Sequence, residues 1–152
     1  MAPLDKRQYT ARVHTIGGRD GGESHSSDGR LDMRYSLPGT TGTGINSEQL
    51  LAAGWSACLL SSIKMIAGAM KVKLPPNLAV DAEVDLCRND GGFFLQSRIY
   101  VSLPGLQNEL AQTLVDEADQ LCPYSKATRG NISVAICVVT ESSKTEFATS
   151  AA

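Results

Sequence analysis

The chain has 152 residues, of which 42% are hydrophobic and 20% charged, and this composition predicts a single folded domain over residues 1–152 and excludes a disordered chain. A net charge of −2 and an aromatic content of 5% argue against nucleic-acid binding, which needs a basic face and stacking side chains, so no nucleic-acid partner is expected. The N-terminus is charged from Asp5 onward without an apolar segment, so we expect no secretory signal and a cytoplasmic location.

The first third of the chain predicts three strands joined by glycine-rich turns. Residues 8–16 alternate between apolar and polar, which is typical of a strand. The turn at 17–22 contains four glycines, and residues 23–27 and 30–37 are expected to pair across an Asp-Gly turn. The Gly- and Thr-rich loop that follows, at 38–44, has the length of loops that often carry function.

A long apolar helix is predicted next. Asn46 is typical of a helix N-cap, and Gln49 completes a capping-box pattern. Apolar residues then occur on nearly every face up to Met70, so we expect a central helix about 36 Å long, buried on more than one side. Lys64 and several serines interrupt this stretch, which favours a buried helix over a membrane span, and no membrane partner is expected.

The second half of the chain predicts a hairpin, a helix and a last strand. Alternating residues at 78–86 and 93–103 flank an Asn-Asp-Gly-Gly turn. An amphipathic helix at 107–121 should stop at Pro123, and residues 132–140 read as a final strand before a polar tail that should fray. This order indicates the α+β class, with antiparallel sheets packed around the central helix.

The cysteines and histidines limit the chemistry. The four cysteines are Cys58, Cys87, Cys122 and Cys137, and no two of them form a Cys-x-x-Cys pair. The lack of such a pair argues against a zinc ribbon or a thioredoxin-like site. With only two histidines, a Cys-His dyad, a Ser-His triad or a histidine-rich metal site is also not favoured, and no metal is expected. Cys87 and Cys137 lie in strand patterns and receive no role.

Three residues are candidates for a site, and each has a structural alternative. Cys58 lies in the apolar helix, where a free cysteine is commonly inert. Cys122 precedes Pro123 at an irregular junction, where we expect a partly exposed thiol near the cations of Lys126 and Arg129, as a reactive thiol requires, although a structural cysteine is the alternative. Arg19 lies in a glycine-flanked loop that permits close backbone approach, or forms a solvated turn.

Four segments in register carry a family resemblance over nearly the whole chain. They are Gly17-Gly18-Arg19-Asp20-Gly21, Asn46-Ser47-Glu48-Gln49-Leu50, Ala52-Ala53-Gly54-Trp55-Ser56-Ala57-Cys58 and Cys122-Pro123-Tyr124-Ser125-Lys126-Ala127-Thr128-Arg129-Gly130-Asn131. Together they resemble the organic hydroperoxide resistance (Ohr) proteins of the OsmC/Ohr superfamily, and the last segment is closer to the Ohr branch than to the OsmC branch. The sequence departs from the family at Ser47, Trp55 and Lys126, where proline, tyrosine and asparagine are frequent.

The resemblance implies a lipoyl-dependent thiol peroxidase with an OsmC/Ohr-like fold. By similarity, Cys58 is the peroxidatic cysteine, Cys122 the resolving cysteine, and Arg19 and Glu48 the pair that activates Cys58. A hydroperoxide would oxidise Cys58 to a sulfenic acid, which would condense with Cys122 to a disulfide. The implied reductant is a dithiol, dihydrolipoamide on a lipoylated protein, with no bound cofactor.

An apolar lining of the site would favour alkyl and fatty-acid hydroperoxides as substrates. The residues expected to form such apolar walls are Leu59, Trp55, Ile63, Phe93 and Phe94. Two other functions stay open on the same fold. One is an OsmC-branch peroxidase with broader peroxide tolerance, and the other is a non-catalytic thiol redox sensor or binding domain.

Helix geometry suggests an intertwined homodimer. Glu48 and Cys58 are ten residues apart on one helix, which separates them by about 15 Å along its axis. Two antiparallel copies of the helix, crossing at the small residues near Ala53, would bring Glu48 of one chain beside Cys58 of the other. The alternative keeps Glu48 in its own chain, with Arg19 reaching along the helix.

Overall fold

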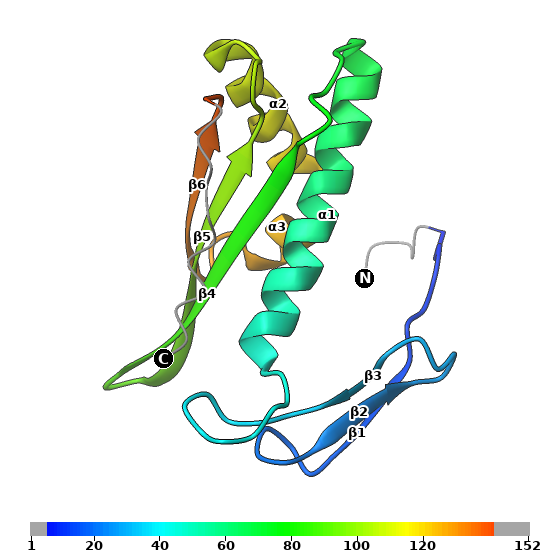
Figure 1. The fold of residues 1–152 in the computed structure, drawn as a ribbon, viewed down its shortest axis with the longest axis vertical. Helices are drawn as coiled ribbons and strands as arrows, with labels where there is room; N and C mark the ends of the chain where they lie inside the picture. The colour runs from blue at the N-terminus through cyan, green and yellow to red at the C-terminus, as the bar shows by residue number, and fades with distance from the viewer. Residues whose placement is uncertain (1–5, 142–152) are drawn as a thin grey trace. The chain divides into compact units, whose positions relative to one another are not determined.

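The computed structural model describes residues 6–141, which form parts of two compact units that meet in sequence between Ser47 and Glu48. The first unit holds the N-terminal strands, and the second holds the long helix, the second sheet and the remaining helices (Figure 1). The polar tail expected to fray lies beyond Glu141, outside the described residues.

The first unit contains a three-stranded antiparallel sheet in the order β1-β2-β3 (Figure 1). Its strands are β1 (Val13–Ile16), β2 (Glu23–Ser26) and β3 (Asp32–Arg34). All three predicted strands are present, but the first and third are shorter than the alternating pattern suggested. The reason is the four-residue length of β2, which offers ladder partners to only a few residues on either side.

The second unit combines a three-stranded sheet with three helices. Its elements are α1 (Ser47–Met70, whose first residue belongs to the first unit), β4 (Ala79–Asn89), β5 (Gly92–Ser102), α2 (Asn108–Leu121), α3 (Pro123–Thr128) and β6 (Ser133–Val139). The predicted β4–β5 hairpin is present, with a register that pairs Ala79 with Ser102 and Asn89 with Gly92. The α+β class and the long helix are confirmed.

The strand β6 corrects the expectation of purely antiparallel sheets. It pairs with β5 in parallel, from Gln96 opposite Ser133 to Ser102 opposite Val139. The helices α2 and α3 form the crossover that carries the chain back along the sheet, so that β6 runs in the same direction as β5. Periodicity along a single strand does not reveal this direction, because both kinds of ladder show an alternation of two.

One face of the second sheet packs with α1 and α2 into the hydrophobic core. Strand β5 contributes Ile99 and Val101, and the inner face of β6 contributes half-buried residues. The core-cluster residues of α1 and α2 are Trp55, Leu59, Ile63, Ala111, Val115 and Ala118, which repeat at intervals of three or four residues and therefore line one stripe of each helix. This core fixes α1 relative to α2 and α3, and so determines where the helix-borne cysteines lie.

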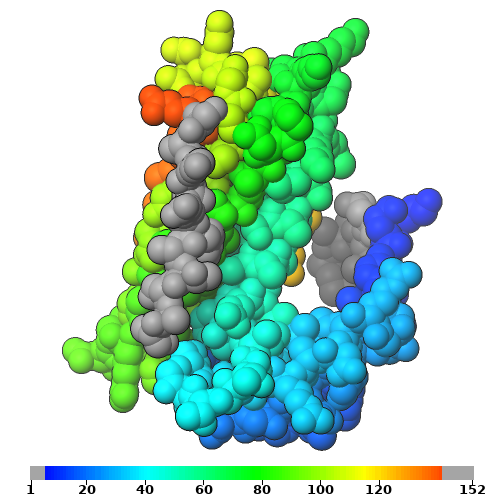
Figure 2. Space-filling model, viewed as in Figure 1, coloured from blue at the N-terminus to red at the C-terminus, as the bar shows by residue number. Residues whose placement is uncertain are grey.

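The helix α1 is buried on one side only within the single chain. Its buried residues are Trp55, Leu59, Ser62, Ile63 and Ala67, whereas Met65 is 66% exposed. A strip of α1 therefore remains on the surface, visible along the helix in Figure 2. By length and composition α1 could also span a membrane, but its buried stripe packs into the core as a soluble core helix does. The single chain thus lacks the second buried side that the sequence predicts.

Candidate active site

The structure brings Cys58 and Cys122 together, although they come from different halves of the sequence. Cys58 lies in the middle of α1 and is half-buried, and Cys122 lies between α2 and α3 and is fully buried. The two thiols share a hydrogen bond. All four cysteines of the chain are free thiols. The site is therefore a pair of interacting free thiols, one from α1 and one from the junction of α2 and α3.

The junction between α2 and α3 places Cys122 by backbone geometry. Cys122 has an extended backbone (φ −63°, ψ 120°) and serves as C-cap of α2 and N-cap of α3. Its amide donates to the carbonyl of Ala118 at 2.8 Å, and its carbonyl accepts from the amide of Lys126 at 3.0 Å. Pro123 ends α2, as predicted, but it also begins α3, a short helix that the sequence reasoning missed. Pro123 itself is a sequence signal for the start of α3, because proline is favoured at the first position of a helix.

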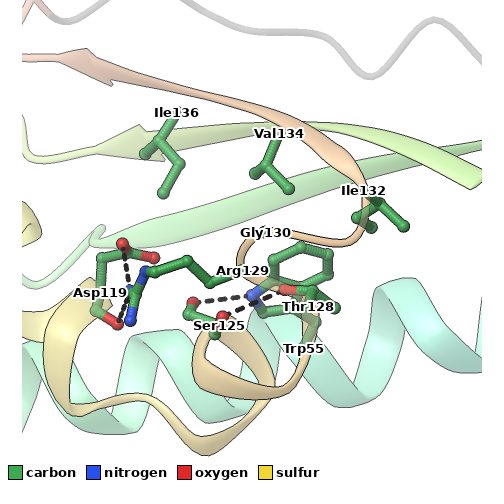
Figure 3. Close-up of a pocket in the computed structure, with 9 residues that line it drawn as sticks. All are labelled: Trp55, Asp119, Ser125, Thr128, Arg129, Gly130, Ile132, Val134 and Ile136. Carbon is green, nitrogen blue, oxygen red and sulfur yellow. Dashed lines mark hydrogen bonds and ion pairs between the residues drawn. The ribbon is translucent and has the colours of Figure 1, made fainter.

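Cys122 is buried rather than partly exposed as expected. It continues the buried stripe of α2, lying four residues after Ala118 on the same helical face. The cation of Arg129 is also less available than the sequence suggests, because its Nη2 donates to the carbonyl and to Oδ2 of Asp119, at 2.9 and 2.8 Å (Figure 3). This ion pair joins the end of α3 to the last turn of α2.

The pKa of the Cys58 thiol is raised above its usual value. Burial is the main cause, the hydrogen bond with the Cys122 thiol raises the pKa further, and a hydrogen bond from the backbone amide of Tyr124 acts in the opposite direction. A thiol with a raised pKa is a poor nucleophile at neutral pH, since the thiolate is the reactive form. Chemistry at Cys58 therefore requires a cation that stabilises its ionised form.

The first turn of α3 is attached to the Cys58 turn of α1 by two further contacts. The indole Nε1 of Trp55 donates to Oγ of Ser125 at 3.1 Å, and both side chains are buried (Figure 3). The Tyr124 hydroxyl lies over Gly54, where a Cβ atom would approach it to 2.5 Å. The sequence reasoning missed both contacts. A buried tryptophan calls for a partner for its N–H, but a partner seventy residues away has no local signal.

A cavity of about 230 Å³ lies between α3 and β6. Its polar side carries the Ser125 and Thr128 hydroxyls and the Arg129–Asp119 pair, and its apolar side carries isoleucine and valine side chains of β6 and the turn before it (Figure 3). Of the expected apolar walls, Trp55 lines this cavity, Leu59 and Ile63 are fully buried in the core, and Phe93 and Phe94 are 70% and 42% exposed near the β4–β5 turn. The five residues therefore do not form one wall within the single chain.

Arg19 is presented by the tight turn after β1. The turn depends on glycine, because a Cβ atom at Gly22 would lie 2.2 Å from the Gly18 carbonyl, and Gly17 has a φ of +74°. The Nη1 of Arg19 donates to Oγ of Ser47 at 3.0 Å within the first unit.

Glu48 belongs to the second unit and lies in the first turn of α1. A carboxylate at this position favours the start of the helix through the helix dipole. With the ten-residue separation along α1, its own carboxylate is about 15 Å from Cys58 along the helix axis.

Comparison with known proteins identifies the family. The family model for OsmC-like protein matches residues 40–136. The organic hydroperoxide resistance protein of Xanthomonas axonopodis pv. citri is 43% identical over 140 residues, which cover 90% of this chain and 98% of that protein. The organic hydroperoxide resistance protein OhrB of Bacillus subtilis is 38% identical over 131 residues, covering 83% and 94% of the two chains.

Solved structures agree with the sequence comparison. The crystal structure of B. subtilis OhrB superposes with a TM-score of 0.79 at 37% identity, covering 86% of this chain and 98% of that one. An organic hydroperoxide resistance protein from Elizabethkingia anophelis gives a TM-score of 0.83 at 36% identity, covering 90% and 99%. The resemblance seen in the four sequence segments is thereby confirmed, and the chain belongs to the OsmC/Ohr family of organic hydroperoxide resistance proteins.

Proposed function

We propose that this chain is a thiol peroxidase that reduces organic hydroperoxides, with Cys58 as the peroxidatic and Cys122 as the resolving cysteine. The observation that carries the proposal is the hydrogen-bonded pair of free thiols, held by two helices from distant parts of the sequence. The names of the relatives add the substrate class, because they describe resistance to organic hydroperoxides.

The reaction needs two steps at the sulfur pair. The Cys58 thiolate attacks one oxygen of the hydroperoxide, the O–O bond breaks, and the alkoxide leaves as the alcohol after taking a proton, so that Cys58 becomes a sulfenic acid. The Cys122 thiolate then attacks the Cys58 sulfur, the hydroxyl leaves as water, and a disulfide forms. The two electrons lost by the pair of thiols equal those gained by the peroxide.

Arg19 and Glu48 supply the activation that Cys58 requires. The raised pKa of Cys58 calls for a cation, and a guanidinium can stabilise the thiolate and also donate to the peroxide oxygens as the O–O bond breaks. A carboxylate can hold such a guanidinium by paired hydrogen bonds, which is the role of Glu48. The bond from Arg19 to Ser47 supports an ordered guanidinium within the first unit.

A homodimer would complete the site. The exposed side of α1 carries small residues, with Ala53, Ala57 and Ser61 spaced four apart, and such a stripe permits the close approach of a second copy of the helix. An antiparallel crossing near Ala53 would bring Glu48 of each chain toward Cys58 of its partner. The dimer would also give α1 the second buried side that its apolar sequence predicts.

The catalytic cycle closes with an external dithiol in the cytoplasm. We propose dihydrolipoamide on a lipoylated protein as the reductant, since a dithiol reduces a disulfide by forming its own, and no bound cofactor takes part. Alkyl and fatty-acid hydroperoxides are the proposed substrates.

A steady-state assay tests this function. The protein should consume cumene hydroperoxide with dihydrolipoamide as reductant, and should turn over hydrogen peroxide more slowly by at least about tenfold, as differential transition-state binding of the alkyl group requires. Equal rates with both peroxides would favour an OsmC-branch enzyme of broader specificity. A single turnover without continued dithiol consumption would instead indicate a redox sensor.

A further inference from the structure

We propose that Trp55 and Ser125 are positioning residues for the resolving thiol, and that their hydrogen bond holds Cys122 ready to capture the oxidised Cys58. The inference rests on the proposed roles of the two cysteines and deepens them. It assigns to a buried indole and a buried hydroxyl a role in deciding whether Cys58 is rescued as a disulfide or lost to further oxidation.

The geometry couples the two pairs of residues directly. Trp55 precedes Cys58 by three residues on α1, which places them about 4.5 Å apart along the axis on neighbouring parts of one face. Ser125 follows Cys122 by three residues, one turn into α3. The contacts Trp55–Ser125 and Cys58–Cys122 therefore join the same turn of α1 to the same turn of α3. A movement of α3 that breaks the first contact must also displace the second.

Packing around α3 is incomplete on one side. On the side toward β6, Ser125, Thr128 and Arg129 border the cavity of about 230 Å³, so α3 has room to move on that side (Figure 3). The Arg129–Asp119 pair secures the far end of α3 but is partly exposed, and such pairs contribute little. The Trp55–Ser125 bond is buried at both ends, with 1% and 3% exposure, and is therefore the better protected polar link near Cys122.

The position of Cys122 matters because two reactions compete for the Cys58 sulfenic acid. Attack by the Cys122 thiolate forms the disulfide and releases water. Reaction with a second hydroperoxide transfers an oxygen to the same sulfur, giving a sulfinic acid and a second alcohol, and this product is not recovered by a dithiol. Only disulfide formation depends on where α3 lies. The peroxide concentration at which half of Cys58 becomes sulfinic acid therefore reports how well Cys122 is positioned.

The test compares Ser125→Ala with wild type in single turnovers over a range of cumene hydroperoxide concentrations. Peroxide consumption gives the rate of the first oxidation, and mass spectrometry gives the shares of disulfide and sulfinic acid at Cys58. We expect an unchanged first rate, and a peroxide concentration for half over-oxidation that is about fivefold lower, the factor that one neutral hydrogen bond typically supplies. Trp55→Phe should lower the concentration for half over-oxidation to a similar extent, and Ser125→Thr, which keeps the hydroxyl, should retain the wild-type value.

Ser97→Ala is the matched control. Ser97 is equally buried, at 3% exposure, and its hydroxyl donates to the Glu83 carbonyl at 2.9 Å between β5 and β4 rather than to a residue of α1 or α3. The Ser97→Ala variant also loses a buried hydroxyl, but it leaves the Trp55–Ser125 hydrogen bond in place. It should therefore over-oxidise at the same peroxide concentration as wild type. If Ser125→Ala and Trp55→Phe match Ser97→Ala, the positioning role is wrong.

Cys122→Ser separates this inference from the proposed function. It should over-oxidise readily, and Ser125→Ala added to it should have no further effect, because the thiol being positioned is gone. If Cys122→Ser over-oxidises no more than wild type, the resolving role itself fails. If Ser125→Ala increases over-oxidation even without Cys122, the residue acts on peroxide access, and the positioning role is overturned while the cysteine roles stand.

Discussion

The thiol of Cys58 is hydrogen-bonded to the thiol of Cys122, and this pairing of a helix residue with a helix-junction residue organises the candidate site. Cys87 and Cys137 lie on β4 and β6 of the sheet. Two of the four thiols therefore interact with each other and the other two lie on strands, and this difference leads to the first prediction.

One equivalent of organic hydroperoxide should produce a single disulfide between Cys58 and Cys122 and leave Cys87 and Cys137 free. Peptide mapping under non-reducing conditions checks this result. Cys58→Ser should abolish turnover, whereas Cys122→Ser should still reduce one equivalent of peroxide and then over-oxidise. A bridge that contains Cys87 or Cys137 would refute the assignment.

Arg19→Ala should raise the pKa of Cys58 further and slow its attack on peroxide. The reason is that burial and the neighbouring thiol already oppose ionisation, so the thiolate depends on an added cation. Arg19→Lys should recover part of the rate, because an ammonium carries the charge but lacks the planar fork. The pH dependence of Cys58 alkylation measures the pKa. An unchanged peroxide rate in Arg19→Ala would exclude the activating role.

Mixing two inactive variants should restore activity if Glu48 acts across a dimer. In a heterodimer of Cys58→Ser and Glu48→Ala chains, one site joins Cys58 of the second chain to Glu48 of the first. We expect about half of wild-type activity per heterodimer, given independent sites. If Glu48 acts within its own chain, a purified heterodimer has no intact site and stays inactive, which would rule out the crossed arrangement.

The ion-pair network on the second sheet predicts a pH-dependent stability. Hydrogen bonds from Arg98 and Gln96 lower the pKa of Asp85 from 3.8 to about 2. The carboxylate therefore stabilises the fold fully above its unfolded pKa, and this contribution is lost as the pH falls through about 2. Because the pair is partly exposed, Asp85→Asn should cost about 1 kcal/mol at neutral pH.

Urea unfolding at pH 7 and at about pH 3 checks the Asp85 prediction. The difference between wild type and Asp85→Asn should shrink to roughly half at the lower pH, because the unfolded carboxyl is then largely protonated. Glu117→Gln, on the exposed side of α2, serves as the control and should show little difference at either pH. A stability difference that stays constant with pH would contradict the linkage.

Two glycines of α1 should respond oppositely to alanine. Gly68 has open space around its Cβ position, so Gly68→Ala should stabilise the helix by up to about 1 kcal/mol. Gly54→Ala should destabilise, because the new methyl group would meet the Tyr124 hydroxyl at 2.5 Å and force the Tyr124 ring to move. Thermal unfolding of both variants tests the contrast, and Gly54→Ala combined with Tyr124→Phe should recover part of the loss.

Local patterns in the sequence predicted the elements well but not their assembly. Alternation located β4 and β5, and the cap at Asn46 located the start of α1, because these signals reside in neighbouring residues. The parallel pairing of β6 with β5 depends on contacts between distant segments, which periodicity does not encode. Burial of Cys122 was detectable from its spacing after Ala118, but the proline beside it suggested an irregular, open junction instead.

The candidate site could also be predicted only in part from the sequence. Residue chemistry alone left Cys58 as an inert core cysteine, and only the family resemblance paired it with Cys122. The structure adds the hydrogen bond between the thiols and the Trp55–Ser125 bond beside it, neither of which has a local signal.

Trp55 is the only tryptophan in the chain, and it is buried one helical turn from Cys58. The ultraviolet emission of the protein therefore originates from a single buried indole beside the sulfur pair. A nearby disulfide accepts an electron from an excited indole and dims it, whereas thiols do so less strongly. The intensity of this natural fluorophore should fall and recover as the pair is oxidised and reduced, which allows each step to be timed without attaching a dye.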